Sequence, residues 1–191
     1  FGTILSEEWK HIQGFFDYLK AKCSEVVVVK GNHDAILDKL VDKKNKEINM
    51  LEKDQLGVPV GWGVVGKNKC KNGQINIVDY YINENVCYLH GDKKFDVKEV
   101  NDCSSWIVGH GHPAIVLNDN VRREKYKCFL VGKHDGREVV VVPSFFPLVE
   151  GSDPREHNLG LAWDFSLGDF EVKVVDGLNT KWFGKLKDVG N

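Results

Sequence analysis

The chain has 191 residues, of which 42% are hydrophobic and 28% are charged. This is the composition of a globular protein, and it excludes a disordered chain, a collagen and a disulfide-dependent mini-protein. The net charge of −2 gives no general affinity for nucleic acid and excludes no local basic patch. No apolar run approaches the roughly 18 residues that a membrane-spanning helix needs.

The first half of the chain has an α/β pattern. A helix is predicted from Ser6 to Lys22, because Ser6 is a good N-cap residue and apolar residues recur at helical spacing. Val26 to Val29 form a run of β-branched residues without alternation, which is typical of a parallel strand covered on both faces. A second helix is expected from Ala35 to about Leu51, followed by a Gly- and Lys-rich loop over residues 57–74.

The rest of the chain is predicted to be mostly β, and antiparallel after residue 113. Strands are expected where short apolar or alternating runs lie between turn residues such as His134-Asp135-Gly136. The expected strands are Ile75–Val78, Asn85–Leu89, Trp106–Val108, Ala114–Leu117, Tyr126–Val131, Val139–Val142, Leu161–Phe165 and Glu171–Val175. No repeat or linker divides the chain, so we interpret residues 1–191 as a single domain.

Three of the apolar strands end in clusters of polar residues. Val26–Val29 leads into Lys30-Gly31-Asn32-His33-Asp34, and the strand ending at Leu89 leads into His90-Gly91-Asp92. Trp106–Val108 leads into Gly109-His110-Gly111-His112-Pro113. Ligands of open α/β sheets bind outside the carboxyl ends of the strands, so these three clusters are expected to converge on one crevice. Their nitrogen and oxygen ligands suit a divalent transition metal.

The His110-Gly111-His112 spacing suggests two ions rather than one. In an extended segment, residues two apart point the same way and lie about 6–7 Å apart. Two histidines placed so could each hold a different ion of a pair separated by about 3.5–4 Å.

These residues resemble the calcineurin-like metallophosphoesterases. Gly31-Asn32-His33-Asp34, His90-Gly91 and Gly109-His110-Gly111-His112 match the later motifs of that family in order. The stretch from Val142 to Leu148, followed by Gly151, is similar to archaeal phosphoesterases related to the bacterial ligase-associated metallophosphoesterase, a nuclease-like group. The resemblance covers about residues 1 to 165 and implies an α/β fold: a four-layer αββα sandwich with mixed sheets inside and helices outside.

The resemblance also implies a role for each matching residue. Asn32, His90 and His110 would bind one metal ion, and His112 the other. His33 would protonate the leaving oxygen or stabilise the phosphoryl charge. Asp34 would accept a hydrogen bond from His33 and fix its tautomer.

Two further residues, Lys30 and His157, are candidates for substrate binding. The implied cofactor is a pair of divalent ions (Mn, Fe or Zn), which would activate a water and stabilise charge on the attacking and leaving oxygens. The implied substrate is a phosphodiester, with nucleic acid as one candidate.

The chain departs from the family pattern at its start. The family's D-x-H and G-D motifs, which supply both carboxylate ligands, are absent before residue 31. Three other features indicate the same missing N-terminal segment: Phe1 stands in place of Met, the single Met is internal at position 50, and the first predicted helix has no strand before it. We therefore expect the domain to be N-terminally incomplete and this chain alone to lack the full binuclear site. Where relatives often have His-Gly-His, this chain has His90-Gly91-Asp92, and the role of Asp92 stays open.

Two alternatives use the same scaffold. One is a phosphomonoesterase acting on a protein or a nucleotide, and the other is a non-catalytic, protein-binding scaffold. Five Cys residues, an odd number without a C-x-x-C pair, indicate reduced thiols and a cytoplasmic protein, with Cys87 and Cys128 as small buried hydrophobes. No membrane partner is expected, and the sequence leaves the metal, the substrate and the oligomeric state open.

Overall fold

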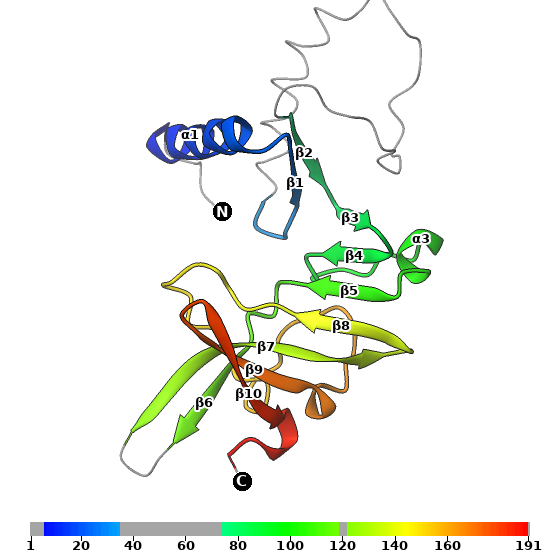
Figure 1. Cartoon of the computed structure of the whole chain (residues 1–191), viewed down its shortest axis with the longest axis vertical. Coiled ribbons are helices and arrows are strands. Elements are labelled where there is room, and N and C mark those ends of the chain that lie inside the picture. The colour runs from blue at the N-terminus through cyan, green and yellow to red at the C-terminus, as the bar shows by residue number, and fades with distance from the viewer. Residues whose placement is uncertain (1–5, 35–73, 119–121, 191) are drawn as a thin grey trace, which may run out of the picture. The chain divides into compact units, whose positions relative to one another are not determined.

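The computed structural model describes residues 6–34, 74–118 and 122–190 (Figure 1). The chain divides into two compact units, Phe1–Val78 and Asp79–Asn191. The single-domain interpretation stays a prediction.

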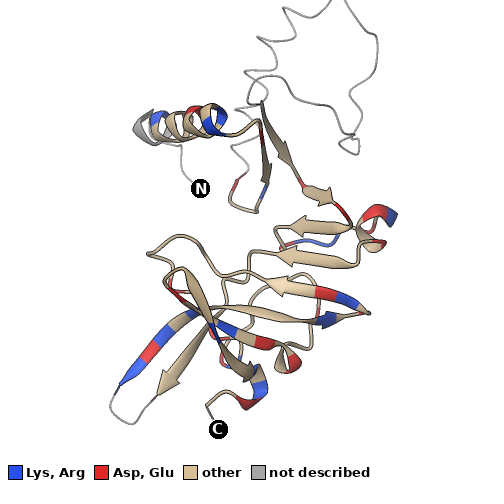
Figure 2. Ribbon diagram, in the orientation of Figure 1, with Lys and Arg blue, Asp and Glu red and all other residues tan. Residues whose placement is uncertain are grey.

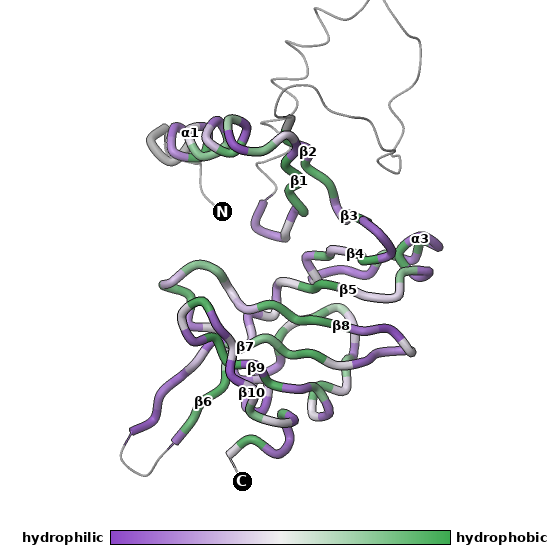
Figure 3. The backbone as a smooth tube through the Cα atoms, in the orientation of Figure 1, coloured by the Kyte–Doolittle hydropathy of each residue, from purple (hydrophilic) through white to green (hydrophobic). Residues whose placement is uncertain are grey.

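The first unit contains a helix and a pair of parallel strands. Helix α1 (Ser6–Lys22) and strand β1 (Glu25–Val29) confirm the two elements predicted at the start of the chain. β1 pairs in parallel with β2 (Gln74–Val78), from Glu25 opposite Gln74 to Val29 opposite Val78, and α1 contacts both strands. Figure 3 shows the continuous hydrophobic run of β1, whose valines are half-buried. The helix expected over residues 35–51 and the loop over 57–73 lie outside the described residues.

The second unit is built on an eight-stranded mixed sheet. Its strand order is β10-β9-β7-β8-β5-β4-β3, and β6 pairs with β7. β4 and β5 are parallel, as are β5 and β8, whereas the other pairs are antiparallel. The strands are β3 (Tyr80–Asn83), β4 (Val86–Leu89), β5 (Ser105–Val108), β6 (Ala114–Asn118), β7 (Arg123–His134), β8 (Arg137–Val141), β9 (Glu171–Asp176) and β10 (Asn179–Lys185).

Helices are few in the described part of this unit. They are the short α3 (Lys98–Asn101) and two single-turn 3-10 helices, η1 (Leu167–Asp169) and η2 (Leu186–Asp188). The fold is therefore mixed α/β with a large mixed sheet, which agrees with the expected class. None of the helices described has the length and hydropathy needed to cross a membrane.

Two tight hairpins fix the register of the sheet. The β7–β8 hairpin turns at Asp135 (φ 49°) and Gly136 (φ 81°), and His134 pairs with Arg137 across it. Both turn residues are left-handed, as a two-residue type I′ loop requires, and Asp-Gly is a preferred sequence for it. The turn predicted at His134-Asp135-Gly136 is thus confirmed. The β3–β4 hairpin turns in the same way at Glu84 and Asn85.

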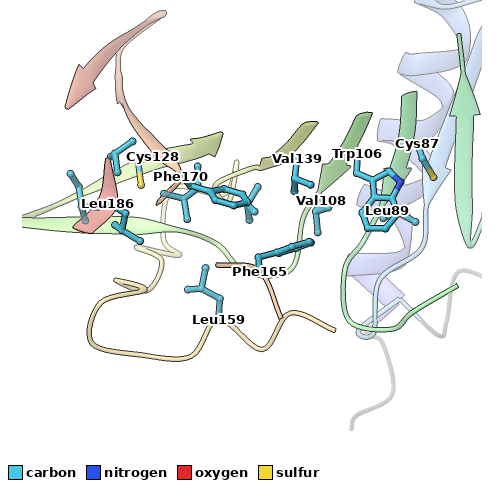
Figure 4. Packing of buried hydrophobic residues seen from close by; sticks show 14 of the residues in the cluster. Cys87, Leu89, Trp106, Val108, Cys128, Val139, Leu159, Phe165, Phe170 and Leu186 are labelled. Atoms are coloured by element: carbon cyan, nitrogen blue, oxygen red, sulfur yellow. The ribbon is translucent and has the colours of Figure 1, made fainter. Parts of the chain in front are cut away.

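The hydrophobic core lies against this sheet and contains many aromatic rings. Trp106 is 2% exposed and packs on Trp163, with ring centroids 5.1 Å apart. Figure 4 shows Phe165 and Leu159, from irregular segments, among the strand residues of the cluster. Cys87 and Cys128 are fully buried, which confirms their predicted role as small hydrophobes.

The strand predicted at Leu161–Phe165 is wrong, because these residues form an irregular segment. Their alternating pattern has another cause: Trp163 and Phe165 stack nearly parallel on each other, at 14°, and belong to the core. Strands β3 and β10 were not predicted. β10 is largely exposed, so its sequence lacks the apolar pattern that marks a strand.

Candidate metal centre

Three parallel strands end at the same edge of the large sheet. Leu89, the last residue of β4, lies opposite Val108, the last of β5, and Val108 lies opposite Val141, the last of β8. Two hydrogen bonds continue the ladder beyond the strands: Gly109 N donates to Leu89 O (3.1 Å), and Val142 N donates to Val108 O (2.8 Å). The segments that begin at His90 and Gly109 therefore leave the sheet side by side, as the strand-end argument predicted for these two clusters.

The His90 and His110 imidazoles meet at this edge. Nε2 of His90 lies 3.2 Å from Nδ1 of His110, and the rings are edge to face with centroids 5.0 Å apart. Two imidazole nitrogens that each lie about 2.0–2.1 Å from one zinc ion are about 3.3 Å apart at the tetrahedral angle. The contact is a hydrogen bond between the two rings, and its length is also compatible with two ligands of a single ion. Both side chains are only half-buried, which leaves the pair accessible.

The Gly109–His112 segment is a turn and not an extended strand. His110 and His112 both have positive φ, at 57° and 43°, and Gly111 N donates to Gly109 O (2.6 Å). The expectation that these histidines follow strand geometry is therefore wrong. A left-handed backbone is rare for a residue with a side chain and persists only where the surroundings impose it. Two such histidines in one turn mark the segment as a specialised site.

Glycines allow the neighbouring segments to approach these histidines closely. A Cβ on Gly91, which has φ 108°, would lie 2.5 Å from Cγ1 of Val108. A Cβ on Gly160, with φ 69°, would lie 3.2 Å from Nε2 of His110. Ala162 N donates to Gly91 O at 2.9 Å, so the segment from Gly160 to Ala162 is tied to the turn after β4.

A buried ion pair that the sequence did not predict lies near His112. Asp153 is 1% exposed; its carboxylate accepts hydrogen bonds from Val116 N (2.8 Å) and from Arg155 N, Nε and Nη2 (3.0, 3.0 and 2.6 Å). Burial acts to raise the pKa of Asp153, but the hydrogen bonds from Arg155 and from the backbone outweigh it, and the pKa is lowered. Arg155 also donates to the carbonyl oxygens of Val116 and Val189.

In the sequence, the only sign of the Asp153–Arg155 pair is that the two charged residues lie two positions apart. Asp153-Pro154-Arg155-Glu156 has the polar, Pro-containing composition that is typical of a solvated loop. The burial of Asp153 depends on β6 and on Val189, which are distant along the chain.

Asn32, His33 and Asp34 form a turn in the first unit. The turn follows β1 directly, because Lys30 N donates to Val78 O (2.8 Å) and so continues the pairing with β2. Oδ2 of Asp34 accepts a hydrogen bond from Gly31 N (2.8 Å), and Asp34 N donates back to Gly31 O (3.1 Å). Asp34 thus closes the turn, and Asn32 and His33 are exposed at its tip. The expected bond between His33 and Asp34 stays a prediction.

The other candidates lie on accessible parts of the two units. Lys30 is half-buried and Asp92 is half-buried. His157 is exposed, and its Nε2 lies 3.9 Å from a carboxylate oxygen of Glu156. His134, at the start of the β7–β8 turn, is half-buried with its ring centroid 4.9 Å from that of Phe165.

Two lysines of β7 fix the segment that follows β8. Figure 2 shows basic residues along β7, and among them Lys127 Nζ donates to the carbonyl oxygens of Ser144 (2.8 Å) and Phe146 (2.6 Å). Lys125 Nζ donates to Gly151 O (3.3 Å). The segment from Ser144 to Gly151 is thereby held in one conformation, with Phe145 fully exposed.

The described residues bring together one pair of candidate metal ligands and no larger set. Within residues 6–34, 74–118 and 122–190, no three His, Cys, Asp or Glu side chains lie close enough together to hold one ion. The donor chemistry of the His90–His110 pair fits a borderline divalent ion such as Zn²⁺. No family model, curated protein or solved structure matches this chain.

Proposed function

We propose that this chain is part of a metal-dependent phosphoesterase with the four-layer αββα sandwich of the calcineurin-like enzymes. The reaction is hydrolysis of a phosphodiester, with nucleic acid as one candidate substrate. The observation that carries the proposal is the His90–His110 pair, whose ring nitrogens are 3.2 Å apart at the carboxyl ends of two parallel strands. That separation suits two ligands on one ion.

The residues have separate tasks in this proposal. His90, His110 and Asn32 hold one ion, and His112 holds the other. When bound, the two ions would supply an activated water and positive charge for the phosphate oxygens. His33 donates a proton to the leaving oxygen, or stabilises the phosphoryl charge, from the tip of the turn that Asp34 closes. Lys30 and His157 contact the substrate.

Metal binding by the chain is the first test. Isothermal titration with Zn²⁺ and with Mn²⁺ is expected to detect an ion whose affinity falls at least about tenfold in His90→Ala and in His110→Ala, because each loses a ligand. His11→Ala is the matched control, since His11 lies exposed on α1. Equal affinity in all four proteins would exclude the His90–His110 pair as a metal site.

Catalysis is the second test, made on the protein loaded with Mn²⁺. Hydrolysis of bis(p-nitrophenyl) phosphate is expected to be lost in His33→Ala, while the metal content stays unchanged. Full activity of this variant would show that the role given to His33 is wrong. Faster turnover of p-nitrophenyl phosphate than of the diester would favour the monoesterase alternative.

A further inference from the structure

His112 is held in an unfavourable backbone conformation by a segment about 40 residues further along the chain. Its φ of 43° places a residue with a bulky imidazole side chain in the left-handed region, and such a conformation needs support from its neighbours. Pro113 follows directly, and Pro113 O accepts a hydrogen bond from Cys128 N (3.1 Å) in β7. The peptide on the other side of His112 belongs to the turn that contains His110.

The support on the carbonyl side of His112 comes from Ser152. Ser152 N donates to His112 O at 2.9 Å, and Ser152 O accepts from Ala114 N at 2.9 Å. Pro113 and Ser152 thus form an isolated parallel bridge. The backbone groups on both sides of Pro113 are thus hydrogen-bonded to Ser152, and this restrains the carbonyl group of His112.

The bridge requires a glycine at position 151. Gly151 has φ 89°, and a Cβ there would lie 2.3 Å from His112 O and 3.1 Å from Cβ of Ala114. No Cβ can lie 2.3 Å from His112 O, and that oxygen cannot move away because the bridge itself fixes it. Gly136 has a similar φ of 81°, but a Cβ on it would meet no atom within 4 Å. Both glycines therefore have a left-handed φ, but only at Gly151 would a Cβ meet neighbouring atoms.

The ion pair of Asp153 and Arg155 holds the next residues in place. The Asp153 carboxylate bonds to Val116 N in β6, and Arg155 bonds to Val116 O at 2.8 Å. Both polar groups of Val116, three residues after Pro113, are therefore used to fix the segment that carries Ser152. The pair is buried at Asp153, where few other conformations can satisfy the carboxylate.

We propose that Gly151, Asp153 and Arg155 are positioning residues, which hold His112 in its left-handed conformation and so direct its imidazole toward the metal centre. The functional meaning of this device rests on the proposed metal site, but the conformational restraint itself does not. The residues act through backbone bonds and do not touch the ion. The device explains why a charged pair is buried beside a surface turn.

The test compares Gly151→Ala and Asp153→Asn with their matched controls, Gly136→Ala and Asp169→Asn. Asp169 is a suitable control because its carboxylate pairs with Lys187 at 2.7 Å on the exposed side of the molecule. The first measurement uses the metal-free chain labelled with ¹³C-histidine, and His112→Gln assigns the His112 ring signal. We expect that signal to move in Gly151→Ala and in Asp153→Asn, and to stay in place in both controls.

The second measurement is Mn²⁺ affinity by isothermal titration: the affinity for the ion that His112 would hold is expected to fall about 10–100-fold in the two variants and not in the controls. An unchanged His112 signal in folded Gly151→Ala or folded Asp153→Asn would overturn the positioning proposal. If Gly151→Ala does not fold, Asp153→Asn decides. If the unsubstituted chain binds no metal while the signal still moves, the positioning proposal stands and the proposed function fails.

Discussion

Gly132 lies near the end of β7, directly against the ring of Phe170, and replacing it with alanine tests the packing of the core. A Cβ on Gly132 would lie 2.3–2.6 Å from three carbons of that ring, well inside contact distance. The ring has little room to move away, because Phe170 is 1% exposed and packs on Phe165 at a centroid distance of 6.1 Å.

The magnitude follows from two opposing effects. Adding a methyl group to a filled core costs about 1–3 kcal/mol in forced rotamers and backbone shifts. Replacing glycine within a strand recovers roughly 0.5–1 kcal/mol, because the unfolded chain has less conformational freedom to lose. The free energy of unfolding of Gly132→Ala should therefore fall by about 1–2 kcal/mol.

Urea unfolding followed by tryptophan fluorescence, to which the buried Trp106 contributes, measures this change. Phe170→Leu, which removes the ring, serves as the companion variant: Gly132→Ala should cost about 1 kcal/mol less in that background, as expected for two groups in contact. Equal stability of Gly132→Ala and the unsubstituted chain would refute the packing argument, as would strict additivity of the two substitutions.

Three other predictions concern helix propensity, thiol reactivity and acid stability. Gly14→Ala in α1, where a Cβ would meet no atom within 4 Å, should stabilise the helix by about 1 kcal/mol, measurable as a higher melting temperature by circular dichroism. Burial raises the pKa of the Cys87 and Cys128 thiols to about 12, so iodoacetamide at pH 8 should label the exposed Cys23 and spare these two until urea unfolds the chain; rapid labelling of Cys87 in the native chain would contradict this. The pKa of Asp153 is lower in the folded chain than in the unfolded chain. Its contribution to the free energy of unfolding is therefore complete above the pKa of the unfolded chain, near 3.9, and is lost as the pH falls through the pKa of the folded chain. Asp153→Ala should cost about 1–3 kcal/mol at pH 7, because it leaves Val116 N and the Arg155 guanidinium without their shared acceptor, and it should flatten the acid limb of the stability curve; an unchanged acid limb would show that another group controls it.

Local sequence patterns predicted most of the elements that position the candidate site. The valine run of β1 and the Asp135-Gly136 turn were correctly predicted, because both depend on residues adjacent in the chain. The segments that leave β4 and β5 with their histidines were also placed correctly at the ends of strands. The error at Leu161–Phe165 arose because alternation records which side chains face a core, and an irregular segment can produce it as well as a strand.

By itself the sequence determined the composition of the candidate site: which histidines, the asparagine, and the strand ends that carry them. Only the tertiary structure decided their geometry within the second unit. The 3.2 Å separation of the His90 and His110 nitrogens depends on the parallel register of β4 and β5, which brings together residues 20 positions apart. The hydrogen bond that His112 O accepts from Ser152 N, and the neighbouring Asp153–Arg155 pair, likewise join His112 to residues about 40 positions further along. Hydrogen bonds and steric contacts at such separations exist only after the sheet has formed, so no local pattern encodes them.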